Sequence, residues 1–244
     1  MKYDSFTDRG SVRKENQDSV FVTEVRSRSC LAAVVCDGMG GAKCGNVASR
    51  MAAEVFIHEI QRGYRAGMTD EQTEYLLTTA VSIANTAVYE NAGLNEDMRG
   101  MGTTLVSILI LGKTAYFANV GDSRAYLLNQ SGITKVTVDH SLVELMVRRG
   151  ELSSEQAKTY PGKNLITRAI GTEESVACDT FCCPIHPGDF FLLCSDGLTN
   201  NLADQELLFE VIHGVHREDC CNRLIGIAKD RGAPDNVTAV LIAC

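Results

Sequence analysis

The sequence predicts an α+β fold in which two antiparallel β-sheets lie between pairs of helices. Short apolar runs joined by tight turns follow one another between residues 103 and 138, which is typical of an antiparallel meander. Amphipathic stretches occur as neighbours near both ends of the chain and do not alternate singly with strands. A four-layer sandwich, with a helix pair on the outer face of each sheet, would use all of these elements.

The first part of the chain holds two strands and the first helix pair. Residues 20–25 alternate like a strand, and the β-branched-rich run 31–36 is typical of a buried strand. Apolar side chains recur at helical spacing over residues 46–61, and Thr69-Asp70 offers an N-cap for a second helix that ends near Gly93. We expect these helices to pack side by side on a sheet.

The middle of the chain is predicted to be a meander followed by a flap. Its strands are 104–111, 115–120, 123–128 and 133–138, with a hairpin turn at residues 121–122. Residues 141–149 are expected to be helical and residues 151–163 to be a polar loop. Residues 141–164 together are the most loop-like internal stretch, so we expect a mobile surface flap.

The last part of the chain returns to strands and a second helix pair. The expected elements are strands 176–183 and 190–195, helices 204–213 and 218–230, and a final strand 237–242. The chain contains no internal repeat, low-complexity tail or linker. A single domain spanning residues 1–244 is therefore predicted.

The composition argues against some classes of function, namely nucleic-acid binding and membrane-spanning proteins. The chain has 244 residues, 45% hydrophobic and 22% charged, which is ordinary for a globular protein with a sizeable core. Its net charge of −8 argues against a nucleic-acid partner. No apolar run is long enough to span a bilayer, and the N-terminus lacks the apolar core of a signal peptide. We expect no membrane span and a cytoplasmic location.

The 10 cysteines contain no Cys-x-x-Cys pair. Cys182-Cys183 and Cys220-Cys221 are adjacent in sequence, which is a poor geometry for zinc binding or an ordinary disulfide. Most of the others lie in apolar runs. We interpret them as reduced, largely buried thiols of a cytosolic protein.

Four aspartates stand at the edges of predicted strands. Asp37 follows the buried run 31–36 and opens the sequence Asp37-Gly38-Met39-Gly40-Gly41, and Asp122, Asp196 and Asp235 each lie beside a glycine or an asparagine. Any one of these pairs could be a plain turn. Several strand-end carboxylates in one chain can instead converge on a hard cation such as Mg²⁺ or Mn²⁺.

Eight short motifs span the chain in a fixed order. They are Gly10-x-x-Arg13-x-x-Asn16-x-Asp18, Asp37-Gly38-Met39-Gly40-Gly41, Met101-Gly102-Thr103-Thr104, Asn119-Val120-Gly121-Asp122-Ser123-Arg124, Asp139-His140-Ser141, Leu165-Ile166-Thr167-Arg168-Ala169-Ile170-Gly171, Cys194-Ser195-Asp196-Gly197-Leu198 and Asp235-Asn236-Val237-Thr238. From end to end the chain resembles the PPM (PP2C-type) metal-dependent serine/threonine protein phosphatases. It looks most like their stand-alone bacterial members.

The resemblance implies a two-metal centre at one edge of the sheets. By this resemblance Asp37 bridges both metals, and Asp196 and Asp235 complete the first metal's ligands. The carbonyl of Gly38 binds the second metal, and Asp18 holds waters around it. The implied cofactors are two Mn²⁺ or Mg²⁺ ions, with a possible weak third.

The resemblance also assigns residues beside this centre. Asp122, with Asp196, matches the third-metal site of bacterial members. Arg13 matches the phosphate-binding arginine, and its planar fork suits two phosphate oxygens. Some relatives carry a histidine, proposed as the general acid, where this chain has Met39, so the general acid is unassigned. His140 is expected to be structural.

The predicted function is hydrolysis of phosphoserine and phosphothreonine in proteins by attack of a water that bridges the metals. The enzyme would remove phosphate groups added by a eukaryotic-like bacterial serine/threonine kinase. Its partners would be that kinase and the kinase's substrates, and it would act as a monomer. The alternative is a catalytically weak binding module, a pseudophosphatase, which would be expected to lose a metal aspartate. The chain has no Gly-x-x-x-x-Gly-Lys-Ser/Thr loop, which disfavours a nucleotide hydrolase.

Overall fold

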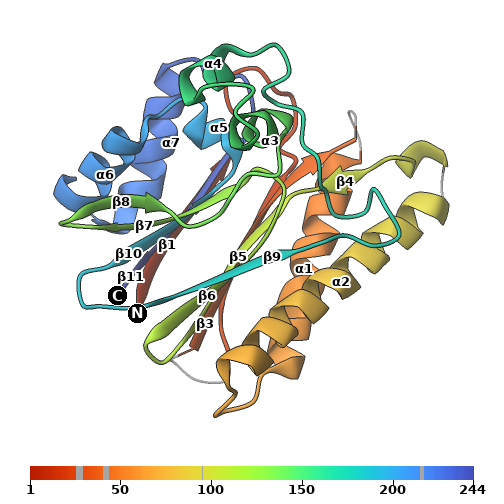
Figure 1. Ribbon diagram of the computed structural model, residues 1–244, viewed down its shortest axis with the longest axis horizontal. Coiled ribbons are helices and arrows are strands. Elements are labelled where there is room, and N and C mark those ends of the chain that lie inside the picture. Colours follow the sequence, from red (N-terminus) through yellow and green to blue (C-terminus); the bar gives the residue numbers. More distant parts are fainter. Residues whose placement is uncertain (26–29, 41–43, 95, 215–216) are drawn as a thin grey trace.

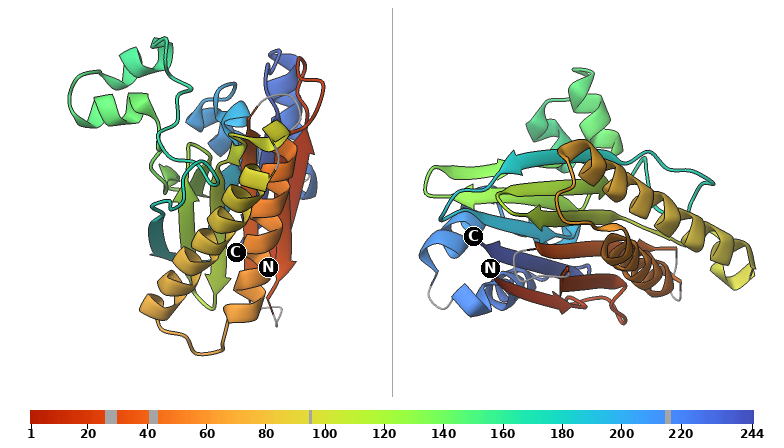
Figure 2. Two further views of the ribbon diagram at one scale, coloured as in Figure 1. Left: turned by 90° about the vertical axis from the view of Figure 1, so that its right-hand side faces the viewer. Right: turned by 90° about the horizontal axis from the view of Figure 1, so that it is seen from below.

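Two antiparallel β-sheets pack face to face, and helices cover the outer face of each sheet (Figures 1 and 2). The computed structural model describes residues 1–25, 30–40, 44–94, 96–214 and 217–244. The α-β-β-α layering confirms the predicted fold class. Within the described ranges, no helix combines the length and the apolar character needed to cross a bilayer.

The first sheet has the strand order β2-β3-β5-β6-β9, with β4 paired to β3. Its strands are β2 (Asp18–Glu24), β3 (Cys30–Met39), β4 (Gly102–Thr103), β5 (Leu105–Leu111), β6 (Thr114–Val120) and β9 (Asp179–Pro184). Its outer face is covered by helices α1 (Gly45–Gly63) and α2 (Asp70–Leu94), which pack side by side as expected (Figure 1). A short 3₁₀ helix, η1 (Glu96–Met98), follows α2.

The second sheet has the strand order β1-β11-β10-β7-β8. Its strands are β1 (Lys2–Asp8), β11 (Val237–Ala243), β10 (Phe190–Cys194), β7 (Arg124–Asn129) and β8 (Gly132–Lys135). The helical elements on this side are α5 (Asp196–Thr199), α6 (Asp204–His213), η2 (Arg217–Asp219) and α7 (Cys220–Asp230). The sequence did not predict β1, because this edge strand is largely exposed and polar and lacks an apolar face.

Three apolar layers hold the sandwich together. One lies between the first sheet and α1 and α2, one between the second sheet and α6 and α7, and one between the two sheets. Phe117 and Phe191 meet edge to face in the middle layer, with ring centroids 5.6 Å apart. Strand β3 is buried on both faces, which explains its unbroken apolar run.

The predicted hairpin at residues 121–122 is wrong. Strand β6 pairs with β5 and β9 in the first sheet, whereas β7 pairs with β10 and β8 in the second. The connection Gly121-Asp122-Ser123 therefore passes from one sheet to the other. A short turn between apolar runs suggests pairing, but it cannot show whether the next strand stays in the same layer. Asp122 lies on this crossing between the sheets.

The segment at residues 141–164 contains two short helices. Helix α3 (Leu142–Arg148) agrees with the prediction, but α4 (Ser154–Thr159) lies within the stretch expected to be a loop. Ser153 and Gln156 form a reciprocal capping box, which stabilises this polar helix at its N-terminus. Both helices project from the sandwich (Figure 2). The mobility expected for this segment stays a prediction.

Candidate metal centre

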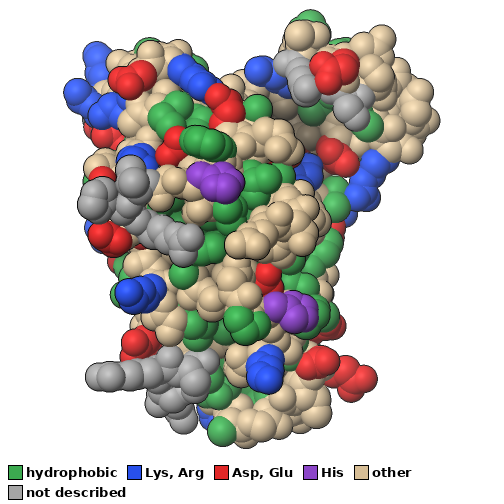
Figure 3. Space-filling model, turned by 90° about the vertical axis from the view of Figure 1, so that its left-hand side faces the viewer, with side chains coloured by type: hydrophobic (Ala, Val, Ile, Leu, Met, Phe, Trp, Pro, Cys, Tyr) green, Lys and Arg blue, Asp and Glu red, His purple; other side chains and the backbone are tan. Residues whose placement is uncertain are grey.

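A cavity of about 680 Å³ opens at one end of the sandwich, where strand ends from both sheets meet. The aspartates predicted at strand edges all line it: Asp37, Asp122, Asp196 and Asp235. Asn164 and Ile166, at the end of the projecting segment, line its other side. In the space-filling view this end of the molecule is hollowed beside the projection, and acidic and basic side chains are interspersed over the face shown (Figure 3).

Asp18 and Asp37 are directly opposite each other on β2 and β3. Asp18 Oδ2 accepts hydrogen bonds from Ser195 Oγ at 2.8 Å and from Thr238 Oγ1 at 2.6 Å. Both donors belong to the second sheet's side, so Asp18 joins the two layers. Its Oδ1 is buried and has no hydrogen-bond partner among the described residues.

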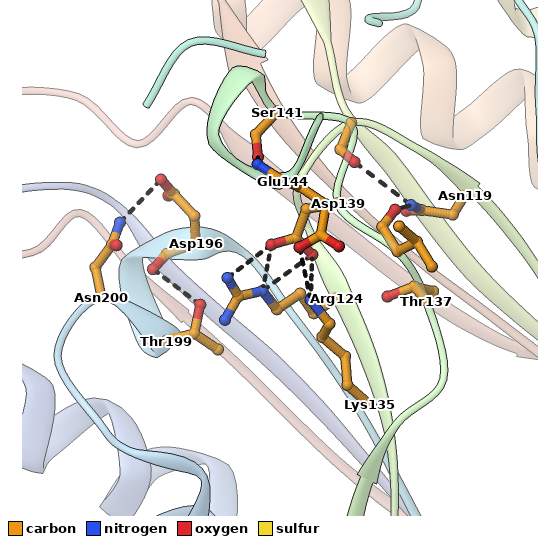
Figure 4. A network of polar contacts seen from close by, with 12 residues as sticks. Asn119, Arg124, Lys135, Thr137, Asp139, Ser141, Glu144, Asp196, Thr199 and Asn200 are labelled. Atoms are coloured by element: carbon orange, nitrogen blue, oxygen red, sulfur yellow. Dashed lines mark hydrogen bonds and ion pairs between the residues drawn. The ribbon is translucent and has the colours of Figure 1, made fainter. Parts of the chain in front are cut away.

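Asp196 begins α5, one residue after the end of β10. Its Oδ2 accepts a hydrogen bond from Asn200 Nδ2 at 3.0 Å, and its backbone carbonyl accepts one from Thr199 (Figure 4). Its Oδ1 is also buried without a partner among the described residues. Buried carboxylate oxygens are ordinarily satisfied. The orphaned oxygens on Asp196, which lines the cavity, and on Asp18, which lies opposite the lining residue Asp37, therefore indicate a missing positive group.

Asp235 and Arg13 lie at the cavity's more exposed side. Arg13 Nη2 donates to Asp235 Oδ2 at 2.8 Å, and the backbone N–H of Asn236 donates to Asp235 Oδ1 at 2.8 Å. The Asp235 hydrogen bond raises the pKa of Arg13. The predicted phosphate-binding arginine is therefore at the cavity, where it contacts a predicted metal ligand.

Asn236 is a residue whose role the sequence reasoning missed. Its Oδ1 accepts from the backbone N–H of Gln17 at 2.8 Å, and its Nδ2 donates to the carbonyls of Arg9 and Glu15 at 3.0 and 2.9 Å. These bonds fasten the loop that carries Arg13 to the start of β11. The local sequence gives no signal for contacts between residues more than two hundred positions apart.

Thr104 is a second missed residue, and it fixes the end of β3. Its Oγ1 accepts from the backbone N–H of Asp37 at 2.9 Å and lies 2.7 Å from Ser123 Oγ. Gly38 follows Asp37 in a space that admits only glycine, because a Cβ there would lie 2.0 Å from the carbonyl oxygen of Gly45. Of the glycine motif, Gly41 lies outside the described residues.

Four carboxylates in or next to the cavity have raised pKa values. Burial, aided by the neighbouring carboxylates, raises the pKa of Asp18 to about 7, that of Asp122 to about 7, and that of Asp37 well above its usual range. Burial and the charge of Asp235 likewise raise the pKa of Asp196. Within the described part of the chain, no lysine or arginine forms an ion pair with Asp18, Asp37 or Asp196. These carboxylates could ionise together only beside an added cation.

The donor set fits a hard divalent cation. The cavity lining includes Asp37, Asp122, Asp196 and Asp235, whose carboxylate oxygens suit magnesium-like ions and not zinc. Among the described residues, no group of three or more His, Cys, Asp or Glu side chains is arranged to hold a metal ion as it stands. An open cavity is compatible with ions that keep several of their waters.

Known proteins resemble this chain over nearly its whole length. A family model described as "Protein phosphatase 2C" matches residues 9–221. The chain is 38% identical over 237 residues to the serine/threonine phosphatase stp of Listeria innocua, covering 97% of this chain and 93% of that protein. It is 33% identical over 246 residues to protein phosphatase PhpP of Streptococcus pneumoniae, covering 100% and 97% of the two chains.

Solved structures are similar in the same way. The serine/threonine phosphatase Stp1 from Staphylococcus aureus superposes with a TM-score of 0.93 at 35% identity, covering 100% of this chain and 94% of that one. The serine/threonine phosphatase PstP/Ppp from Mycobacterium tuberculosis superposes with a TM-score of 0.87 at 34% identity, covering 98% and 97%.

Proposed function

The chain belongs to the protein phosphatase 2C family of metal-dependent serine/threonine phosphatases, and from this premise we propose how its cavity performs the hydrolysis. It is a protein serine/threonine phosphatase of the bacterial type. We infer that its cations are Mn²⁺ or Mg²⁺, held at the cavity end of the sandwich. The observation that carries this inference is the pair of buried, unpartnered oxygens on Asp18 and Asp196.

Specific roles for the cavity residues follow from the donor chemistry and the resemblance. Asp37 would bridge two cations, Asp196 and Asp235 would hold the first, and the Gly38 carbonyl would bind the second. Asp18 would act through waters, and Asp122 with Asp196 would hold a third, weaker ion. All of these residues except Asp18 line one cavity, which supports these assignments. Asp18 lies next to it, opposite the lining residue Asp37 in the pairing of β2 with β3.

Divalent cations held there would supply a water of lowered pKa and would neutralise the substrate's phosphate charge. The chain's own contribution is to fix the carboxylates and to bind the phosphate. Arg13 uses Nη2 on Asp235, which leaves other N–H groups of its guanidinium for phosphate oxygens. Asn236 and Thr104 hold the backbone on both sides of this arrangement.

Met39 lines the cavity and has no proton to donate to the leaving group. Among the cavity's described lining residues there is no histidine. We therefore propose that the serine or threonine hydroxyl that leaves takes its proton from water and not from a side chain at position 39.

We further propose phosphoproteins made by a bacterial serine/threonine kinase as substrates, a cytoplasmic location and a monomeric enzyme. All ten cysteines lie in the described residues and are free, which fits a reducing compartment. The alternative, a weak binding module, is disfavoured because Asp37, Asp196 and Asp235 are all present at the cavity.

The test is phosphate release from a phosphothreonine peptide by metal-stripped protein, with and without added Mn²⁺ or Mg²⁺. We expect turnover only with the cation, and its abolition by EDTA. Undiminished turnover in stripped protein would contradict the metal assignment. Absence of turnover under every cation condition would favour the binding module.

A further inference from the structure

His140 lies outside the cavity lining and clamps the peptide group next to Asp122. Its side chain is buried, and its Nδ1 accepts a hydrogen bond from the backbone N–H of Gly121 at 3.1 Å. Its own backbone N–H donates to the carbonyl of Gly121 at 2.9 Å. One residue therefore binds both polar groups of Gly121.

The opposite edge of the imidazole is held by Asp179. Because Nδ1 accepts from Gly121, the ring proton of the neutral side chain is on Nε2, which lies 3.1 Å from Asp179 Oδ2. Arg168 Nη1 donates to Asp179 Oδ1 at 2.7 Å. It also lies 3.1 Å from His140 Nε2, but two N–H groups cannot bond each other, so Asp179 joins them. Burial lowers the pKa of His140, which agrees with a neutral ring.

Thr104 packs closely against Gly121. Gly121 has a φ of 106°, and a Cβ at this position would lie 2.6 Å from Thr104 Cγ2. Asp122 follows directly and lines the cavity. The chain crosses between the sheets here without strand pairing, so side-chain contacts hold the turn. Besides His140 and Thr104, Asn119 Nδ2 donates a longer bond to the Gly121 carbonyl at 3.4 Å. We infer that these contacts set the direction in which Asp122 points.

His140 also stands where the projecting segment leaves the sandwich. The backbone N–H of Thr167 donates to the carbonyl of His140 at 2.7 Å, and that of Leu142 donates to Leu165 at 2.8 Å. The two ends of the segment are thus paired beside the ring that holds Gly121.

We propose that His140 is a positioning residue for the phosphatase reaction. It fixes the Gly121–Asp122 turn against the base of the projecting segment, and thereby holds the Asp122 carboxylate in the cavity. Asp179 holds the imidazole ring of His140 in place, and Arg168 holds Asp179. This inference rests on the proposed role of Asp122 as a cation ligand.

The first experiment compares H140A with H140N. Asparagine has a carbonyl oxygen near the position of Nδ1 and can accept from Gly121, whereas alanine cannot. Loss of a residue that orients a metal ligand costs about 10- to 100-fold, so we expect H140A to lower kcat on p-nitrophenyl phosphate by that factor with little change in KM. H140N should recover most of it.

The matched control is H186A. His186 also pairs with an aspartate, Asp189, at 3.5 Å, but it is exposed and does not line the cavity. We expect its kinetics to equal those of the wild type. Calorimetric Mn²⁺ titration of H140A should retain the tight ions and weaken only the loosely held one. Loss of a tight ion would overturn the proposal, since Asp122 is not among the proposed ligands of the two tightly held ions.

A double-mutant cycle tests whether His140 acts through Asp122. If it does, H140A lowers kcat in the wild type but adds nothing in D122A. Multiplicative losses overturn the proposal, and so does a D122A variant of full activity beside an impaired H140A. Should H140A not fold, D179N carries the test, with a smaller loss expected in the same direction.

Amide exchange at Gly121 measures the clamp without activity. It should be slow in the wild type, faster in H140A and slow again in H140N. A Gly121 amide that stays protected in H140A overturns the clamp. Failure of the proposed function is separate, because a wild type without phosphatase activity leaves this readout intact.

Discussion

Asp139 and Asp18 are both 8% exposed, yet the surroundings of these two carboxylates are opposite in character. Asp139 binds Arg124 through three hydrogen bonds of 2.7–3.2 Å and Lys135 Nζ at 3.3 Å (Figure 4). Asp18 has only two hydroxyl donors, and its Oδ1 has no partner among the described residues. Among the described residues, Arg124 and Lys135 pair with Asp139, whereas no lysine or arginine pairs with Asp18.

This difference separates a structural carboxylate from one that awaits a ligand. A buried charge is costly unless it is paired, and the pair Arg124–Asp139 meets that requirement within the chain. Around Asp18 and Asp37 the requirement is unmet, and burial raises the pKa of both. The simplest way to meet it is a divalent cation, and the predictions below test this contrast.

The largest effect is expected from Asp37→Asn. If Asp37 bridges the cations, its loss removes several kcal/mol of transition-state stabilisation, or a decrease of about a thousandfold in kcat. Steady-state kinetics on p-nitrophenyl phosphate with saturating Mn²⁺ would measure it. A rate near that of the wild type would refute the bridging role.

The contrast itself predicts opposite stability changes for Asp139→Asn and Asp18→Asn in metal-stripped protein. Removing the charge of Asp139 leaves Arg124 without its carboxylate and Lys135 with only the 3.9 Å ion pair to Glu144, and should cost roughly 3 kcal/mol of unfolding free energy. Removing the charge of Asp18 should stabilise the metal-free fold near neutral pH and above. Urea denaturation in EDTA measures both. Equal destabilisation by the two changes would contradict the distinction between a paired carboxylate at Asp139 and an unpaired one at Asp18.

The pH dependence of this stability has a definite sign. The pKa of Asp18 is about 7 in the folded state and about 3.9 when unfolded, so the folded state binds more protons between these values. Metal-stripped protein should lose stability as pH rises through about 7. Asp18→Asn should reduce that slope. A metal-stripped wild type that is more stable at high pH would contradict the raised pKa.

A smaller effect is expected from Arg13→Ala, which tests the arginine found among the cavity's described lining residues. Because the guanidinium would clamp the ground-state phosphate, KM should rise by more than kcat falls. A rise of about tenfold corresponds to one charge-assisted hydrogen bond. An unchanged KM with a collapsed kcat would assign Arg13 to the transition state instead.

The smallest effect on the chemistry is expected from Arg148→Ala with Arg149→Ala on the projecting segment. Both side chains are exposed and form only long surface ion pairs, with Glu144 and Glu151. Turnover of p-nitrophenyl phosphate should stay unchanged, while rates on phosphopeptides should change if the segment contacts protein substrates. Equal losses on both substrates would mean that the segment supports the cavity.

The sequence predicted the features that local pattern encodes. The apolar run before Asp37 gave β3, and helix α6 begins and ends where its periodicity does, at Asp204 and His213. The strand-end aspartates were expected to lie close together, because several carboxylates at strand edges can bind one hard cation. Helix α4 was not predicted, because the polar composition of residues 151–163 indicated a loop, although Ser153 and Gln156 form a capping box at its start.

Other features depend on contacts far apart in the chain. The crossing of residues 121–123 between sheets is fixed by which strand β7 pairs with, and no local motif encodes that. The same holds for Asn236, which binds the carbonyl of Arg9 near the other end of the chain. It also holds for His140, which accepts a hydrogen bond from Gly121. Pairing partners of buried polar groups are decided by topology, so they emerge only from the structure.

The most direct test of the central claim is calorimetric titration of Mn²⁺ into metal-stripped wild type and Asp37→Asn, with Asp70→Asn as a control. Asp70 pairs with Tyr116 and does not line the cavity. We predict about two tight ions in the wild type and in the control, as in a two-metal site, and loss of tight binding in Asp37→Asn. Wild-type protein that binds no Mn²⁺ tightly, or Asp37→Asn protein that binds it as the wild type does, would contradict the account.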